Sequence, residues 1–183
     1  WSHYTPVPGF VDVREAVCVK LKRDNNLDYK PENIVTSTGA KQSLANVILA
    51  LVDDDDEVII PTPYWVTYSE LVKIARGKVV EVRTSLESGF KVTPAQLEAA
   101  ITGKTKVFMF SSPCNPSGAV YSKTELAALA QVFRKYPNIY ILADEIYEYI
   151  NFVGKNESIA QFADLKDRTI IVNGLSKGFA MTG

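Results

Sequence analysis

The sequence predicts an α/β protein, a three-layer α-β-α sandwich built around a mostly parallel sheet. Two observations lead to this prediction: near-continuous apolar runs recur along the chain, and amphipathic stretches of helical period separate them. Parallel strands buried on both faces read as continuous apolar runs, and helices usually connect them. With 183 residues, of which 46% are hydrophobic, the chain is long enough for one domain with a substantial core.

The predicted elements alternate along the chain. The strands are rich in β-branched and aromatic residues, and they cover residues 33–37, 58–61, 79–82, 106–110, 139–143 and 169–173. The helices repeat apolar residues every three or four positions, and they cover residues 11–25, 41–52, 65–75, 94–101 and 123–136. Such alternation is typical of a parallel sheet with helices on both faces.

Composition excludes several functional classes. The 20 basic and 21 acidic residues are well mixed, so no basic stripe is available for a phosphodiester backbone, and we expect no nucleic-acid partner. No apolar stretch approaches the roughly 20 residues needed to span a bilayer, and the first residues do not resemble a signal peptide. We therefore expect a cytoplasmic protein without a membrane partner. Cys18 and Cys114 form no C-x-x-C pattern and are expected to be free thiols.

The single histidine argues against common hydrolase chemistries. His3 lies in a proline-rich terminal segment, where a surface position is expected. Because Ser-His-Asp and Cys-His hydrolases need an imidazole within the body of the fold, catalysis here must rely on lysine, aspartate, tyrosine or a cofactor. The acidic run Asp53–Asp56 is expected to be a solvated turn rather than a metal site.

Distinctive polar and aromatic residues follow the ends of the predicted strands. They fall in five segments: residues 38–42, 62–65, 111–118, 144–147 and 174–177. In open parallel sheets, ligands bind at the carboxyl ends of the strands, so these segments indicate a site. Turn residues also gather at strand ends in any α/β protein, which makes the clustering alone modest support.

The segment Thr38–Lys41 has the features of a phosphate site. A glycine-containing turn that enters a helix presents free backbone N–H groups and the positive end of the helix dipole. The segment lacks the glycine patterns of the P-loop and of the dinucleotide fingerprint, so a plain strand-to-helix turn remains an equal interpretation. A nucleotide-binding doubly wound domain is disfavoured for the same reason.

Five side chains add further chemistry. Trp65 is placed either to pack in the core or to cover a planar ring, and Asn115 either shapes a turn or donates to a phenolate oxygen. Asp144 follows an apolar run, so we expect it to be partly buried, to need a cationic partner, and to lie near Tyr147. Lys177, in a desolvated pocket, would be a nucleophile toward carbonyls.

Together these groups match the requirements of pyridoxal 5'-phosphate. That cofactor needs a phosphate nest, an aromatic plate, a donor to its ring hydroxyl, an acid against its pyridine nitrogen and an amine for its aldehyde. Each element alone is weak support. Five of them in compatible positions along the chain are strong support for this cofactor.

The sequence resembles the class I and II aminotransferases of the fold-type I pyridoxal phosphate enzymes, and within them the bacterial aspartate aminotransferases. The segments that carry the resemblance are YTPVPGFVDVREAV, VTSTGAKQSL, PTPYWVTYSE, SSPCNPSGAVYS, ADEIYEYI and VNGLSKGFAMTG. The resemblance implies that residues 1–183 form a single domain, most of the large cofactor-binding domain, without the N-terminal arm and the C-terminal small domain. It also implies that the chain by itself is inactive or nearly so.

The resemblance assigns catalytic roles to three side chains. Lys177 is implied to be the Schiff-base lysine, Asp144 to pair with the pyridine nitrogen, and Tyr147 to hydrogen-bond the ring hydroxyl. Asn115 shares the contact to the ring hydroxyl. Trp65 is implied to stack on the ring, and Trp65 and Asn115 are implied to line the substrate site.

The resemblance also assigns the phosphate contacts. The backbone of Gly39, Ala40 and Lys41 is implied to hold the phosphate, with help from Ser176. Tyr4 is implied to reach the phosphate of a neighbouring subunit, which predicts a homodimer with shared active sites.

Two positions depart from the family pattern. Many relatives carry a phosphate-binding serine three residues before the lysine, and Gly174 stands there in this chain. The asparagine turn usually has another polar residue in place of Cys114, a change that leaves Asn115 where it is expected.

The function implied is transfer of an amino group from an amino acid, aspartate or a similar one, to a 2-oxo acid in amino-acid metabolism or biosynthesis. Two alternatives stay open: another fold-type I enzyme, such as a β-lyase, decarboxylase or synthase, and a non-catalytic module of the same shape. Lys177 and Asp144 do not separate the reactions, because substrate-facing groups set the choice among them.

Overall fold

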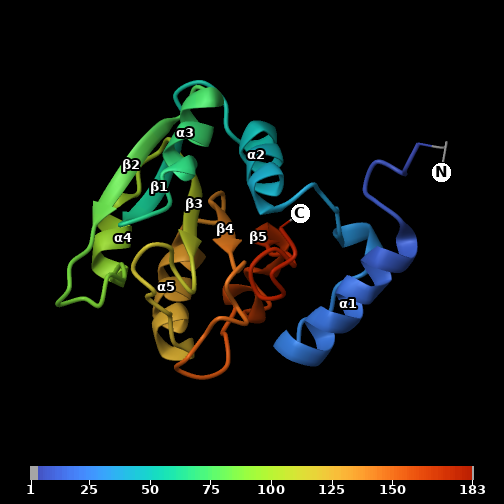
Figure 1. Cartoon of the computed structure of the whole chain (residues 1–183). Helices are drawn as coiled ribbons and strands as arrows, with labels where there is room; N and C mark the ends of the chain where they lie inside the picture. The colour runs from blue at the N-terminus through green and yellow to red at the C-terminus, as the bar shows by residue number, and fades with distance from the viewer. Residues whose placement is uncertain (1–3, 183) are drawn as a thin grey trace.

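A computed structural model of the chain describes residues 4–182, so the expected surface position of His3 lies outside the described residues. The described part contains one five-stranded sheet in which every pairing is parallel, in the order β2-β1-β3-β4-β5 (Figure 1). The strands are β1 (Glu57–Thr62), β2 (Lys78–Arg83), β3 (Thr105–Ser111), β4 (Tyr140–Asp144) and β5 (Thr169–Val172). The prediction of an α/β fold is confirmed.

Helices cover both faces of the sheet, which confirms the three-layer prediction. The apolar faces of α2 (Ala40–Leu51) and α3 (Thr67–Ile74) pack on one side. Those of α4 (Pro94–Ala100) and α5 (Lys123–Lys135) pack on the other. Strands β1, β3 and β4 are mostly buried, because both of their faces meet a helical layer.

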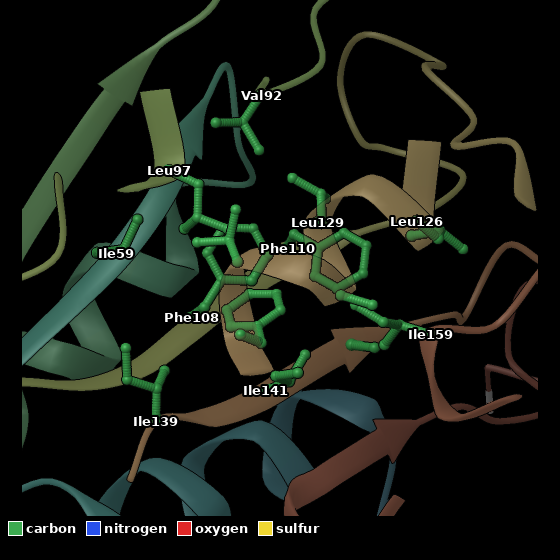
Figure 2. Packing of buried hydrophobic residues seen from close by; sticks show 14 of the residues in the cluster. Ile59, Val92, Leu97, Phe108, Phe110, Leu126, Leu129, Ile139, Ile141 and Ile159 are labelled. Atoms are coloured by element: carbon green, nitrogen blue, oxygen red, sulfur yellow. The ribbon is translucent and has the colours of Figure 1, made fainter. Parts of the chain in front are cut away.

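The larger of the two cores lies between the sheet and the α4–α5 layer (Figure 2). Phe108 of β3 is fully buried, and its ring lies 5.2 Å from that of Phe110 and 5.3 Å from that of Phe133 on α5. Ile59, Leu97 and Leu129 close around these rings. Burial of each such side chain contributes about 1.5–3 kcal/mol, so this layer holds the sheet rigid beneath its carboxyl edge.

Helix α1 (Val11–Asn25) lies apart from both layers, on the β5 side of the sheet (Figure 1). Its one buried side chain, Leu21, packs with Leu27 and Ala160, and Ile171 of β5 packs against this small cluster. Short 3-10 helices flank it at η1 (Pro31–Asn33), η2 (Ile159–Gln161) and η3 (Lys166–Arg168). Few apolar contacts attach α1, so polar contacts contribute more to its docking.

The predicted strand at residues 33–37 is wrong. Its backbone turns toward the segment before α1, where the Thr36 N–H donates to the Pro8 carbonyl over 3.0 Å. Val35 is exposed, so this run provides no continuous apolar face to bury in the sheet. Helix α3 also begins at Thr67, two residues later than predicted, because Trp65 belongs to the turn that precedes it.

The acidic run forms the predicted solvated turn. Asp53, Asp54 and Asp55 are exposed, and Asp54 and Asp55 pair with Arg76 and Lys78 across the start of β2. Within residues 4–182, no group of three or more potential ligands is placed to hold a metal ion. Both cysteines are free, as predicted. None of the helices in this part of the chain is long and apolar enough to cross a membrane.

Candidate functional site at the carboxyl edge of the sheet

The strand register places three of the predicted site segments at one edge. Ser111, the last residue of β3, pairs with Asp144 of β4, which pairs in turn with Val172 of β5. Asn115 follows Ser111 by four residues, and Lys177 follows Val172 by five. A parallel sheet therefore directs Asn115, Asp144 and Lys177 to the same carboxyl edge.

The strand order reverses at this edge between β1 and β3. Neighbouring connections diverge to opposite faces at such a point, which leaves a crevice where ligands bind in open α/β sheets. Trp65 follows the end of β1 by three residues, and Asn115 follows the end of β3. The two residues that the sequence suggested for a planar ligand therefore flank the reversal point.

Asp144 is the most deeply buried of the predicted site residues, with 3% of its surface exposed. Its Oδ2 accepts a 2.6 Å hydrogen bond from the Tyr68 hydroxyl, and its Oδ1 accepts one of 3.1 Å from the Ile146 N–H. Burial raises the pKa of the Asp144 carboxyl, and these two donors oppose the rise. A carboxylate has about four acceptor sites, so it keeps capacity for a further donor.

Tyr68 is a partner of Asp144 that sequence reasoning missed. It is buried in α3, and burial, followed by the charge of Asp144, raises the pKa of its phenol well above the usual range. The phenol therefore stays protonated and donates to Asp144. From the sequence, Tyr68 is expected to be a core aromatic residue. The one feature that could have indicated its role is its hydroxyl, which needs a hydrogen-bond partner when it is buried. We expected a cationic partner for Asp144. Among the described residues, its side-chain partner is instead the neutral Tyr68 hydroxyl.

Trp65 and Lys41 meet beside Tyr68. The Trp65 ring stands edge-on to that of Tyr68, with centroids 5.9 Å apart and planes 79° apart. The Lys41 ammonium lies over the Trp65 ring, 5.0 Å from its centroid. The sequence pointed to the backbone of Lys41, whereas the structure also links its side chain through Trp65 and Tyr68 to Asp144.

The predicted phosphate segment does enter a helix. Gly39 has φ +90°, a conformation that favours glycine, and α2 begins at the next residue, Ala40. A Cβ built on Gly39 has no neighbour within 4 Å, so the approach to this turn is open. Because Gly39 has no side chain to cap the helix, the first N–H groups of α2 remain available to an anion.

Lys177 is exposed, so the expectation of a desolvated pocket is wrong for this chain. The lysine lies in a turn after β5, where Gly178 is in close contact with Tyr149: a Cβ at Gly178 would lie 3.0 Å from the Cβ of Tyr149. Ser176 is half-buried, and its carbonyl accepts from the Thr182 hydroxyl. The turn is packed on one side only, and the Lys177 amine is left in solvent.

The remaining predicted residues differ in exposure. Tyr147 and Asn115 are half-buried at the carboxyl edge, after β4 and β3 respectively. Tyr4 is fully exposed at the N-terminal end of the described chain. At the position where relatives carry serine, a Cβ on Gly174 would lie 3.2 Å from the Ile146 side chain, so a side chain there requires Ile146 to shift.

A partly open pocket beside Tyr68 is too small for an organic ligand. It measures about 10 Å³, room for about one water molecule, and Tyr68, Ser111, Cys114 and Tyr121 contribute to its lining. The Ser111 hydroxyl is buried there without a protein partner among the described residues. This pocket has no room for a cofactor, so a cofactor of this site would bind elsewhere on the carboxyl edge.

The donor set at this edge fits pyridoxal phosphate. Asp144 is a buried carboxylate that lacks a cation among the described residues, and its electrostatics suit a protonated ring nitrogen. The open start of α2 suits a phosphate, and Lys177 offers an accessible amine. These three features come from β4, α2 and the turn after β5, which reach one edge of one sheet.

The sequence model of the family "Aminotransferase class I and II" matches residues 1–183. The chain belongs to this aminotransferase family. Over its whole length it is 48% identical to the aspartate/prephenate aminotransferase of Nitrosomonas europaea and 48% identical to the aspartate aminotransferase of Bacillus subtilis. This aminotransferase-family chain spans 47% of each of these relatives, about half their length.

Solved structures place this aminotransferase-family chain in the same fold. The crystal structure of the aspartate aminotransferase from Rhizobium meliloti superposes on 99% of the chain with a TM-score of 0.97 and 43% identity. The chain covers 46% of that protein. The family and the fold implied by the sequence resemblance are thereby confirmed.

Proposed function

We propose that the full-length protein carrying this sequence is a pyridoxal phosphate-dependent aminotransferase that moves an amino group from an amino acid to a 2-oxo acid. The observation that carries the proposal is Asp144, a buried carboxylate held by a neutral hydroxyl at the same sheet edge as the accessible Lys177. Membership of the class I and II aminotransferases supports it, as do the names of the relatives.

Pyridoxal phosphate, when bound, supplies an aldehyde that condenses with amines and a pyridinium ring that accepts electrons. Asp144 would hold the ring nitrogen in its protonated form, because an ion pair relieves the cost of its own burial. Tyr68 would keep Asp144 oriented and hydrogen-bonded. Lys177 Nζ would hold the cofactor covalently and, once released, accept the proton from the substrate Cα as general base.

The other residues would bind and orient. The backbone of Gly39, Ala40 and Lys41 at the start of α2 would hold the phosphate through the N–H groups of Ala40 and Lys41, because the Gly39 N–H donates to the Ser37 carbonyl over 2.8 Å. Ser176, on the turn after β5, would add a hydroxyl. Trp65 would cover the ring face, with its own orientation fixed by the edge contact to Tyr68.

Asn115 and Tyr147 would donate to the ring hydroxyl from the turns after β3 and β4. Trp65 and Asn115, on either side of the strand-order reversal, would also face the substrate. Aspartate is the proposed amino donor, because both curated relatives carry its name; prephenate, named for one of them, is the second acceptor class to assay.

We further propose that residues 1–183 form most of the large domain of a cytoplasmic homodimer that functions in amino-acid biosynthesis. The continuous three-layer core supports a single domain. Exposure of Tyr4, together with exposed Val7 and Val11 near it, supports contact with a second subunit. Analytical ultracentrifugation of the full-length protein would test the dimer, and a monomer at micromolar concentration would contradict it.

Turnover and trapping test the function together. The full-length protein should convert aspartate and 2-oxoglutarate to oxaloacetate and glutamate, and borohydride should fix pyridoxal phosphate on Lys177. Release of carbon dioxide or of a β-substituent without amino transfer would favour the decarboxylase or lyase alternative. Absence of both trapping and turnover would contradict the proposal and favour the non-catalytic module.

A further inference from the structure

A buried polar network joins α1 to the turn that carries Lys177. Its centre is Glu148, which lies four residues after Asp144 and whose side chain is 3% exposed. Lys20 of α1 forms an ion pair with Glu148 Oε1, and the Lys20 ammonium also donates to Asn25 Oδ1 over 2.9 Å. A carboxylate this deeply buried costs several kcal/mol without a partner, so Lys20 provides its compensation.

Asn173 transmits this network to the lysine turn. Its Nδ2 donates to Glu148 Oε2 over 2.8 Å, and its Oδ1 accepts from the Gly174 N–H over 2.7 Å. The amide thus uses its donor on the buried carboxylate and its acceptor on the first peptide of the turn. Lys177 lies three residues beyond that peptide. Glu148 therefore fixes the position at which the chain leaves β5 for the lysine.

Tyr149 holds the far side of the same turn. Its ring meets that of Phe179 at 5.1 Å and 71°, and its hydroxyl donates to Asp24 of α1 over 2.5 Å. The Lys20 ammonium lies 5.3 Å from the centre of the Tyr149 ring. Glu148 thus contacts the turn before Lys177, and Tyr149 contacts it after Lys177. Both residues also contact α1.

We propose that Glu148 is a positioning residue for Lys177, acting through Asn173 and paired with Lys20. The inference rests on the proposed role of Lys177 as the amine that holds the cofactor. The exposed Lys177 side chain has no packing of its own to fix it, so its placement depends on the backbone of the turn. The same short segment, residues 144–149, would then contain Asp144 and also determine the position of Lys177.

The test separates the hydrogen bond to Asn173 from the buried charge. In a Lys20→Met background, Glu148→Gln keeps an oxygen for the Asn173 amide and Glu148→Leu removes it, while neither leaves a buried charge unpaired. Each 183-residue variant is mixed with pyridoxal phosphate and reduced with borohydride. Peptide mass spectrometry then gives the label on Lys177 relative to exposed lysines such as Lys123, and thermal unfolding is followed in parallel.

We expect the wild type and the Gln variant to favour Lys177, and the Leu variant to lose about tenfold of that preference, the equivalent of one hydrogen bond. Asn173→Ala removes the link from its other end and should give the same loss; it decides the outcome if the Leu variant fails to fold. The control Lys135→Met with Glu98→Leu, a surface pair 2.8 Å apart on α5 and α4, should leave the preference unchanged.

Three results would overturn the positioning role. One is a Leu variant, folded like the Gln variant, that keeps the Lys177 preference within twofold. The second is a Gln variant that loses as much as the Leu variant, since the charge and not the link to Asn173 would then matter. The third is a wild type without any preference for Lys177, which would contradict the proposed function as well and is recognisable because it needs no substitution.

Discussion

Asp144 and Lys177 leave the same edge of one sheet, yet the chain treats them in opposite ways. Asp144 is the last residue of a central strand, is buried, and has a hydrogen bond to each carboxylate oxygen. Lys177 lies in an exposed turn that is tied to the fold through its neighbours Asn173, Gly178 and Phe179. The proposed acid is therefore preorganised by the core, and the proposed nucleophile by a polar network.

This contrast follows from where each segment lies in the sheet. Strand β4 has a neighbouring strand on both sides and helices on both faces, so the backbone at its end is held in place by packing. Strand β5 has four residues, two of them only half-buried, and within residues 4–182 it pairs with β4 alone.

The largest effect is expected from removing the lysine itself. Lys177→Ala should abolish the borohydride-stable label at that position and leave the thermal unfolding midpoint within about 1 °C, because an exposed side chain contributes little to stability. Mass spectrometry and circular dichroism measure the two quantities. A label that remains on the 170–183 peptide would contradict the assignment.

Removing core packing next to the strand that carries Asp144 should instead lower the free energy of unfolding. Phe108→Ala should lower the free energy of unfolding by about 3–5 kcal/mol, because it deletes a fully buried ring from the larger core. Leu175→Ala, in the exposed part of the lysine turn, should change it by less than about 0.5 kcal/mol. Urea unfolding of both variants checks the comparison, and equal losses would show that the turn is as tightly packed as the core.

Loss of one hydroxyl should weaken the acid side of the site. Tyr68→Phe removes a donor from Asp144, so the pKa of that carboxyl rises further and binding of pyridoxal phosphate weakens by about tenfold. Tyr64→Phe is the matched control, because the Tyr64 hydroxyl donates over 2.6 Å to exposed Glu81. Absorbance titration compares them, and identical affinities would remove Tyr68 from the site.

A further expected effect is a slope of stability with pH that belongs to Glu145. Burial raises the pKa of this fully buried carboxyl from 4.5 to about 8. Between these values the folded state keeps the proton and the unfolded state has lost it. Stability therefore falls as the pH rises, by at most about 1.4 kcal/mol for each unit.

Glu145→Gln should flatten that slope, while Glu15→Gln on the exposed face of α1 should preserve it. Urea unfolding at pH 5, 6.5 and 8 gives the slopes. A wild type whose free energy of unfolding rises over this range would contradict the buried, protonated state of Glu145.

Much of the fold could be predicted from the sequence because its elements carry unambiguous periodicity. Five apolar runs became the five strands, and the helix from Val11 was placed with both of its ends right. The run at residues 33–37 misled because an apolar, β-branched segment does not reveal whether a neighbour is available to pair with it. In the structure its backbone bonds to Pro8, a long-range contact without a local signal.

Site residues could be predicted only where the residue type and its place in the local sequence indicate a chemical role. Asp144 after an apolar run and Gly39 before a helix have physical reasons to be where they are. Tyr68 and Glu148 could not be found in this way, because their partners Asp144 and Asn173 are 76 and 25 residues away in the chain. The exposure of Lys177 was also beyond reach, since it depends on what packs over a turn.

The central claim is that Asp144 and Lys177 bind opposite ends of one heterocycle, Asp144 at the ring nitrogen and Lys177 at the aldehyde carbon. A crystal structure of the borohydride-reduced complex with pyridoxal phosphate tests it most directly. The account predicts a covalent bond from Lys177 Nζ and a ring nitrogen about 2.7–3.2 Å from an Asp144 carboxylate oxygen. A ring joined to Lys177 whose nitrogen points into solvent, with Asp144 still bound only to Tyr68 and Ile146, would contradict it.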